Sequence, residues 1–142
     1  MKIVCKVTRG KEVESCHEVY AIALDEGGKI ILSAGDQDYI TCIRSALKPF
    51  QASAAILEGA TEEAGFISEE IALMCASHNG EKIHAQTAMK MAQKLGLHAS
   101  QYECGIHPPY DKRTREEARK LNTIFTPFHN NCSGKHSGML SL

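Results

Sequence analysis

The sequence predicts an α+β fold in which an antiparallel sheet is packed with helices. Residues 2–8, 18–24 and 29–34 are rich in β-branched and apolar residues and are followed by polar turns, which is typical of strands. From residue 50 onward, apolar residues recur at helical spacing. Strands first and helices afterwards indicate an α+β layout, and 43% hydrophobic residues in a chain of 142 suffice for a core.

Composition excludes some classes of function. The formal net charge is −1, with 16 basic and 17 acidic side chains interspersed, so no basic stripe suits nucleic acid. No apolar run reaches membrane-spanning length, and the first residues lack the core of a signal peptide. We therefore expect a cytoplasmic protein without a membrane partner. The six cysteines are scattered, without a C-x-x-C pair, and most should be free in a reducing compartment.

The first elements are predicted to be a β-hairpin over residues 17–34, with residues 2–8 as a neighbouring strand. Asp25-Glu26-Gly27-Gly28 is the tight-turn signal inside this hairpin. Residues 35–38 form a second turn, and the segments that carry chemistry follow it.

A Ser-x-x-Lys pair occurs at Ser45 and Lys48. Residues three apart on a helical turn share a face, so the amine can reach the hydroxyl and, when neutral, take its proton. Desolvation or a nearby cation lowers a lysine pKa toward this role, and Arg44 and Lys135 are candidate cations. Pro49 is least disruptive if Ser45 lies at or just before the first helical turn. Taken alone, the pair is more often a capping serine beside a solvated lysine.

Two helices are predicted next. Residues 50–60 form an amphipathic, alanine-rich segment that ends near Gly59. The second helix begins at Ser68, whose hydroxyl suits an N-cap, and runs through an apolar stretch to residue 75. Two glutamates in its first turn fit the positive end of a helix dipole.

A strong helix is predicted over residues 81–95 and a short charged one over residues 114–121. In the charged helix, Thr114 and Glu117 have the spacing of a capping box. Residues 124–126 are predicted to be a short strand. The residues expected to face the core from the helix over 81–95 are Ala85, Ala88, Met89, Ala92 and Leu95.

Two connections hold polar side chains. His78-Asn79-Gly80 is compatible with an ordinary turn, but Ser77 would lie at its start, beside an exposed helix N-terminus. The second connection, residues 104–111, is rigid and proline-rich. Cys104 and His107 are three apart, which is no standard zinc spacing, so a structural loop is favoured.

Residues 129–141 carry the densest group of reactive side chains: a thiol, an amine, two imidazoles, two amides and three hydroxyls. Gly134 and Gly138 would let the backbone approach a ligand or take a positive φ. Apolar residues arrive only at the end, which indicates a functional loop leading into a helix. Unpaired N–H groups at a helix start suit a carboxylate or an oxyanion. The alternative is a polar turn that caps a helix through Ser133, which the density of reactive groups disfavours.

Residues 130–140, Asn-Asn-Cys-Ser-Gly-Lys-His-Ser-Gly-Met-Leu, resemble the signature of the L-asparaginase II family, the Rhizobium etli or thermolabile type. Arg-Ser-x-x-Lys at 44–48, Ala-Ser-His-x-Gly-Glu at 76–81 and Cys-Gly-x-His-x-Pro at 104–109 resemble further family motifs in the same order. The resemblance therefore covers essentially the whole chain. It implies a fold similar to serine β-lactamases and glutaminases.

The resemblance also implies roles for individual residues. Ser45 and Lys48 correspond to the nucleophile and its base, and Ser77 to a second serine–lysine pair whose lysine lies outside the present sequence. Arg44 is the best candidate to bind a substrate carboxylate, because its planar guanidinium can donate two parallel hydrogen bonds to the two carboxylate oxygens. We assign substrate binding to Arg44, His136, Asn79 and Gly80.

Zinc is implied in the same way. Cys132 and Lys135 correspond to two of its ligands, with a further cysteine contributed later in the chain. A thiolate is an ordinary zinc ligand, whereas a lysine must be neutral to bind. His136 is a tempting third ligand, but a substrate contact or an orienting group is preferred.

These observations predict an amidohydrolase that converts L-asparagine to L-aspartate and ammonia and forms a homodimer. The chain stops inside a helical pattern at residues 138–142, and family members are roughly twice this length. We therefore expect residues 1–142 to be the N-terminal part of a single asparaginase-like domain. One alternative is a serine amidase of the β-lactamase or glutaminase kind, which a Lys-Thr-Gly motif would favour and this sequence lacks. The other is a non-catalytic zinc-binding or interaction fragment.

Overall fold

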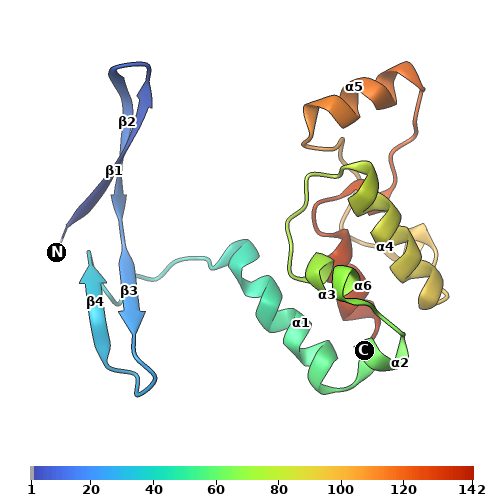
Figure 1. Ribbon diagram of the computed structural model, residues 1–142, viewed down its shortest axis with the longest axis horizontal. Coiled ribbons are helices and arrows are strands. Elements are labelled where there is room, and N and C mark those ends of the chain that lie inside the picture. The colour runs from blue at the N-terminus through green and yellow to red at the C-terminus, as the bar shows by residue number, and fades with distance from the viewer. Residues whose placement is uncertain (1) are drawn as a thin grey trace. The chain divides into compact units, whose positions relative to one another are not determined.

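The structure is a computed structural model that describes residues 2–142. The chain divides into two compact units, Met1–Cys42 and Ile43–Leu142. The first holds the strands and the second the helices (Figure 1), which confirms the α+β class. The expectation of one asparaginase-like domain stays a prediction.

Two separate hairpins make up the first unit, in place of the single sheet that was predicted. One is formed by β1 (Ile3–Arg9) and β2 (Glu12–Val19), the other by β3 (Ala21–Leu24) and β4 (Ile30–Ala34), both antiparallel. The predicted hairpin over 17–34 therefore exists only from β3 onward. Sequence reasoning missed most of β2 because five of its eight residues are polar or charged, which weakens a strand signal.

The turn between β3 and β4 confirms the predicted turn signal. The Asp25 carboxylate accepts hydrogen bonds from the backbone N–H groups of Gly27, at 3.0 Å, and Lys29, at 2.8 Å. Gly28 has φ of +79°, a conformation that suits glycine. The side chain and the glycine together close the hairpin.

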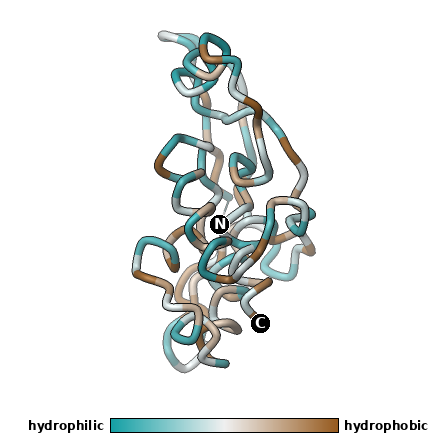
Figure 2. The backbone as a smooth tube through the Cα atoms, turned by 90° about the vertical axis from the view of Figure 1, so that its right-hand side faces the viewer, coloured by the Kyte–Doolittle hydropathy of each residue, from teal (hydrophilic) through white to brown (hydrophobic). Residues whose placement is uncertain are grey.

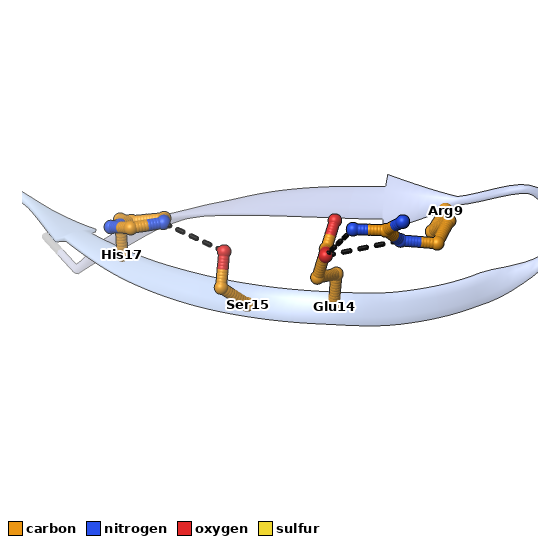
Figure 3. A network of polar contacts seen from close by, with 4 residues as sticks. All are labelled: Arg9, Glu14, Ser15 and His17. Atoms are coloured by element: carbon orange, nitrogen blue, oxygen red, sulfur yellow. Dashed lines mark hydrogen bonds and ion pairs between the residues drawn. The ribbon is translucent and has the colours of Figure 1, made fainter.

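Polar contacts lie on the exposed surface of the β1–β2 hairpin (Figure 3). Arg9 on β1 forms an ion pair with Glu14 on β2, and Ser15 Oγ lies 2.9 Å from His17 Nε2 on the same strand. Residues two apart on a strand share a face, which brings this serine and histidine together. Exposed pairs of this kind contribute little to stability.

Six α-helices and three short 3-10 helices form the described second unit. They are η1 (Arg44–Leu47), α1 (Lys48–Leu57), α2 (Ala60–Glu63), α3 (Ser68–Met74), α4 (Lys82–Lys94), η2 (Ala99–Gln101), α5 (Lys112–Lys120), η3 (Pro127–His129) and α6 (Ser133–Leu140). Helix α6 packs against α1, α3 and α4 (Figure 1). The buried core consists of Ala52, Ala55, Leu73, Met74, Ala88, Met91, Ala92, Tyr102 and Phe128.

Hydropathy alternates along the backbone tube, with short apolar stretches between hydrophilic ones (Figure 2). This pattern is typical of helices that bury one side against a core. Over residues 2–142, none of the helices combines the length and apolar character needed to cross a membrane.

The glycines of α6 serve helix packing rather than ligand approach. An added Cβ on Gly134 would lie 2.3 Å from Leu73 O, and one on Gly138 would lie 2.4 Å from Met74 Cε. Neither glycine has a positive φ. The expectation that these glycines bring the backbone to a ligand was therefore wrong, because they let α6 and α3 pack closely.

The N-cap of α3 lies one residue before the predicted position. Ile67, not Ser68, is the N-cap of α3, and the Glu70 carboxylate accepts the Ile67 N–H at 2.8 Å. Glu70 is buried and accepts a second hydrogen bond from Lys94 Nζ on α4, at 2.6 Å. Its role is therefore to join two helices as well as to cap one.

Helix α5 is capped by Asp111, whose carboxylate accepts the Thr114 N–H at 2.6 Å. The predicted capping box that starts at Thr114 was wrong by one turn. On α4, Met91 is buried and Met89 is 43% exposed, the reverse of the expectation for Met89. Residues 124–126 do not form a strand.

Candidate active site

The Lys48 side chain is buried at the start of α1 and is surrounded by oxygen acceptors. Its amine donates to Ser77 Oγ at 2.6 Å, to Ala76 O at 2.8 Å and to Asn131 O at 3.4 Å. The residue is only 3% exposed. These three oxygens are acceptors for the N–H groups of the amine, so the buried group keeps hydrogen-bond partners.

Local sequence explains how Lys48 reaches this position. η1 ends at Leu47, and α1 begins at Lys48 with Pro49 in its first turn, where a missing N–H breaks no helical hydrogen bond. Lys48 has helical dihedrals, with φ of −57° and ψ of −40°, although proline disfavours this region for the residue before it. The first-turn placement of Ser45 and Pro49 agrees with the sequence prediction.

Ser45 is exposed, and its backbone carbonyl accepts the Lys48 N–H. Within residues 2–142, no hydrogen bond joins the Ser45 hydroxyl to the Lys48 amine; the serine bonded to that amine is Ser77. The resemblance implied the opposite pairing, with Lys48 serving Ser45 and another lysine serving Ser77. The structure thus places Ser77, from the loop after α3, beside Lys48 of the Ser45–Lys48 pair.

A cavity of about 300 Å³ lies beside this lysine. Five predicted site residues line it, although they come from η1, α1 and the start of α6. The cationic side chains at its wall suit an anionic group such as a carboxylate, and none of the described lining residues is acidic. The lining residues are Arg44, Ser45, Leu47, Lys48, Gln51, Cys132 and Lys135.

Arg44 adopts a backbone conformation that a non-glycine residue rarely takes. Its φ is +51°, in the left-handed region. Such a conformation costs about 1–2 kcal/mol for an L-residue with a side chain. Strained residues of this kind often occur where a side chain must be held for function, and here Arg44 is one of the residues that line the cavity.

Asn79 and Gly80 do not line the cavity. Asn79 is exposed and its carbonyl accepts the Asp111 N–H at 3.1 Å. Gly80 is buried with φ of +74°, and an added Cβ would lie 2.7 Å from His129 O. Its N–H donates to His78 Nδ1 at 3.1 Å, so this donor is already occupied. Both residues fasten the loop that carries Ser77.

His136 lies on α6 and is half-buried. Its Nδ1 is 3.1 Å from the carbonyl oxygen of Cys132, one helical turn earlier. The ring does not line the cavity, although Cys132 and Lys135 do. This geometry fits an orienting role, in which His136 bonds to the backbone at the start of α6.

Residues 5–142 match one known protein family. The family is described as L-asparaginase II, and the match covers nearly the whole chain. The chain belongs to the L-asparaginase II family. No curated protein matches it. Family membership indicates an asparaginase-type hydrolase that acts on a small molecule.

Sequence reasoning missed Asn130 in this L-asparaginase II chain. Its side-chain amide donates to Cys104 O at 2.7 Å and accepts the Cys132 N–H at 2.8 Å. Asn130 is buried and joins the 104–109 motif to the start of α6. The sequence signal for Asn130 was its place two residues before Cys132, and this place did not distinguish an amide that holds the backbone from one that binds a ligand.

His78 was also missed. It was taken as part of a turn, but its ring is 4% exposed and stacks on His84 at 5.1 Å between centroids. Nε2 of His78 lies 2.8 Å from Ser133 Oγ. Burial, together with the charges that His84 and Lys48 can carry, lowers the pKa of His78 to about 4, so the ring is neutral at pH 7.

Proposed function

We propose that the protein hydrolyses the side-chain amide of L-asparagine to L-aspartate and ammonia through a serine–lysine nucleophile. The observation that carries this proposal is the buried Lys48 residue, which lines the cavity and whose amine contacts Ser77 Oγ at 2.6 Å. Family membership supports the reaction class. The cationic cavity supports a substrate with a carboxylate.

The proposed reaction uses residues of this chain alone. The Ser45 hydroxyl, at the cavity wall, attacks the amide carbon, and the neutral form of Lys48 takes the hydroxyl proton. Lys48 then gives the proton to the departing nitrogen, the C–N bond breaks and ammonia leaves. Water hydrolyses the resulting aspartyl ester. Ser77 positions the amine or relays protons, and backbone N–H groups stabilise the oxyanion.

Arg44 binds the α-carboxylate of the substrate in this proposal. A guanidinium can donate two parallel hydrogen bonds to a carboxylate, which fixes orientation as well as adding affinity. In the absence of zinc, Lys135 adds a second positive charge at the cavity wall.

Ser77 is the second candidate for the nucleophile. It is the serine whose hydroxyl contacts the amine, and it is exposed. An acyl group trapped on Ser77 rather than Ser45 would assign the attack to it.

Zinc fits these residues only in part. Cys132 and Lys135 line the same cavity and supply a thiol and an amine, which are donors that zinc accepts when they are deprotonated. Among residues 2–142, no group of three or more His, Cys, Asp or Glu side chains could hold a metal ion. Two donors do not form a closed zinc site. We therefore propose zinc binding at Cys132 and Lys135 only as a partial ligand set and route no step through the metal.

Ammonia release tests the proposal. Wild type, Ser45→Ala, Ser77→Ala and the exposed control Ser100→Ala are assayed with L-asparagine, with and without zinc. We expect release by wild type and the control and a loss of about 10²-fold or more in both site variants. Folded wild type without release would contradict the proposal, as would full activity in both site variants.

The same assay separates the alternatives. Faster turnover of L-glutamine or a β-lactam than of L-asparagine would favour the other serine amidases. Stoichiometric zinc binding without amidase activity would favour a non-catalytic metal-binding protein. Mass spectrometry of protein quenched during turnover locates the acyl group on one serine.

A further inference from the structure

His78 is a buried polar side chain next to Ser77 that the proposed reaction does not use. It lies in the loop between α3 and α4 and is 4% exposed. A loop residue whose ring enters the interior must exchange its water contacts for partners in the protein. The partners of this ring are specific enough to define its protonation.

Two hydrogen bonds fix the tautomer. Gly80 N–H can only donate, so His78 Nδ1, at 3.1 Å, accepts and carries no proton. In a neutral ring the proton is then on Nε2, which donates to Ser133 Oγ at 2.8 Å. Ser133 Oγ in turn donates to the carbonyl of Phe128 at 3.2 Å. Every donor in this series of hydrogen bonds, from Gly80 to Phe128, has an acceptor.

The ring of His78 links the loop that carries Ser77 to the start of α6. Its Gly80 bond closes the loop that carries Ser77, and its Ser133 bond reaches the first residue of α6, between Cys132 and the cavity residue Lys135. The backbone adds a third link, because the His78 N–H donates to Asn131 O at 3.3 Å. That same carbonyl accepts from Lys48 Nζ at 3.4 Å.

We propose that His78 is a positioning residue: as the neutral Nε2–H tautomer it holds the Ser77 loop against the start of α6 and keeps the Ser77 hydroxyl within reach of Lys48. The kinetic consequence rests on the proposed function, whereas the tautomer and the geometry do not. A displacement of about 1 Å at a reacting group can reduce a rate by about 100-fold.

Substitutions can remove one hydrogen bond at a time. The Oδ1 atom of asparagine overlaps the position of Nδ1, so His78→Asn retains an acceptor for Gly80 and loses the donor to Ser133. The side-chain nitrogen of glutamine overlaps Nε2, so His78→Gln retains the donor and loses the acceptor. Ser137→Ala is the matched control. Ser137 is a fully buried hydroxyl one turn further along α6, and it contacts Tyr102 instead of His78.

The first readout is NMR of protein with labelled histidine and lysine, which needs no catalysis. We expect a neutral His78 ring at pH 7 with its proton on Nε2, and a shift of the Lys48 side-chain resonances in His78→Asn or His78→Gln. Ser137→Ala should leave the Lys48 resonances in place. A charged ring, a proton on Nδ1, or unchanged Lys48 resonances in folded His78 variants would overturn the proposal, whether or not ammonia is released.

The second readout is steady-state kinetics of the folded variants. We expect kcat to fall by about 10–100-fold in the His78 variants with KM changed by less than about threefold, because the groups that bind substrate remain. Ser137→Ala should retain kcat even if it lowers the midpoint of thermal unfolding by as much as the His78 variants do. Equal loss of kcat in Ser137→Ala would reduce His78 to a stabilising role and overturn the proposal. Wild type that shows the expected NMR behaviour but no turnover would instead contradict only the proposed function.

Discussion

Lys48 Nζ and Ser77 Oγ lie 2.6 Å apart although the two residues are 29 positions apart in the chain. The lysine comes from the first turn of α1, and the serine from the loop after α3. Both helices pack against α6, which contributes Lys135 to the cavity beside them. The contact therefore depends on the packing of three helices, and it bonds the buried amine to Ser77 rather than to Ser45.

Lys48→Met should abolish most of the activity. The substitution retains length and apolar volume but removes the base, which contributes about 10²–10⁴-fold in rate. It also leaves the Ala76 carbonyl and the Ser77 hydroxyl without a donor, so the free energy of unfolding should fall by about 1–3 kcal/mol. Ammonia release and urea unfolding measure the two effects. Lys90→Met, at an exposed position on α4, is the control and should change neither.

Two substitutions at Arg44 should separate its effect on substrate binding from its effect on stability. Both Arg44→Ala and Arg44→Gly remove the guanidinium from the cavity, so KM for L-asparagine should rise by about 10–100-fold, the value of a charge-assisted hydrogen bond. The glycine variant should be more stable than the alanine variant by about 1 kcal/mol, because only glycine takes a φ of +51° without strain. Kinetics and urea unfolding test the pair. A wild-type KM in both variants would remove Arg44 from the substrate site.

Local patterns predicted much of this molecule. The Asp25 turn, the end of α1 near Gly59 and the position of α4 follow from side-chain chemistry within a few residues, and the structure confirms them. The Ser45 and Lys48 pair and the start of α6 line one cavity, and the roles assigned to them there stay predictions.

Long-range packing accounts for what was missed. No local pattern reports that Lys48 would bond to Ser77, since several helices must first come together. The burial of His78 and the close approach of Gly134 to Leu73 depend on the same packing. The signature stretch therefore combined two roles that the sequence did not separate: Cys132 and Lys135 line the cavity, whereas Ser133 and Ser137 are buried.

Gly134→Ala should destabilise the protein more than Gly138→Ala. The added Cβ would meet backbone at Gly134, 2.3 Å from Leu73 O, but the end of a flexible side chain at Gly138, 2.4 Å from Met74 Cε. Alanine favours a helix over glycine by about 1 kcal/mol, which offsets part of each clash. We expect a net loss of about 2 kcal/mol or more at Gly134 and a change within about 1 kcal/mol at Gly138. Equal midpoints in urea for the two variants would contradict close packing of α6 on α3.

Acid should destabilise the protein through His78. The folded-state pKa is lowered from 6.5 to about 4, by burial first and then by the charges of His84, Lys48, His107 and His129. Between these pH values the unfolded chain binds more protons than the folded one, so the free energy of unfolding falls as the pH falls from 6.5 toward 4 and is fully retained above 6.5.

The size of this effect is testable by urea unfolding at pH 7.5 and pH 5.0. The contribution of His78 to the free energy of unfolding should fall by about 2 kcal/mol from pH 7.5 to pH 5.0. His129 adds a smaller loss in the same direction, because burial also lowers its pKa. His78→Gln cannot titrate, so its unfolding free energy should change less with pH than that of wild type, whereas His98→Gln, at an exposed position, should keep the wild-type dependence. If His78→Gln and wild type show the same dependence on pH, the buried ring is not the group that acid charges.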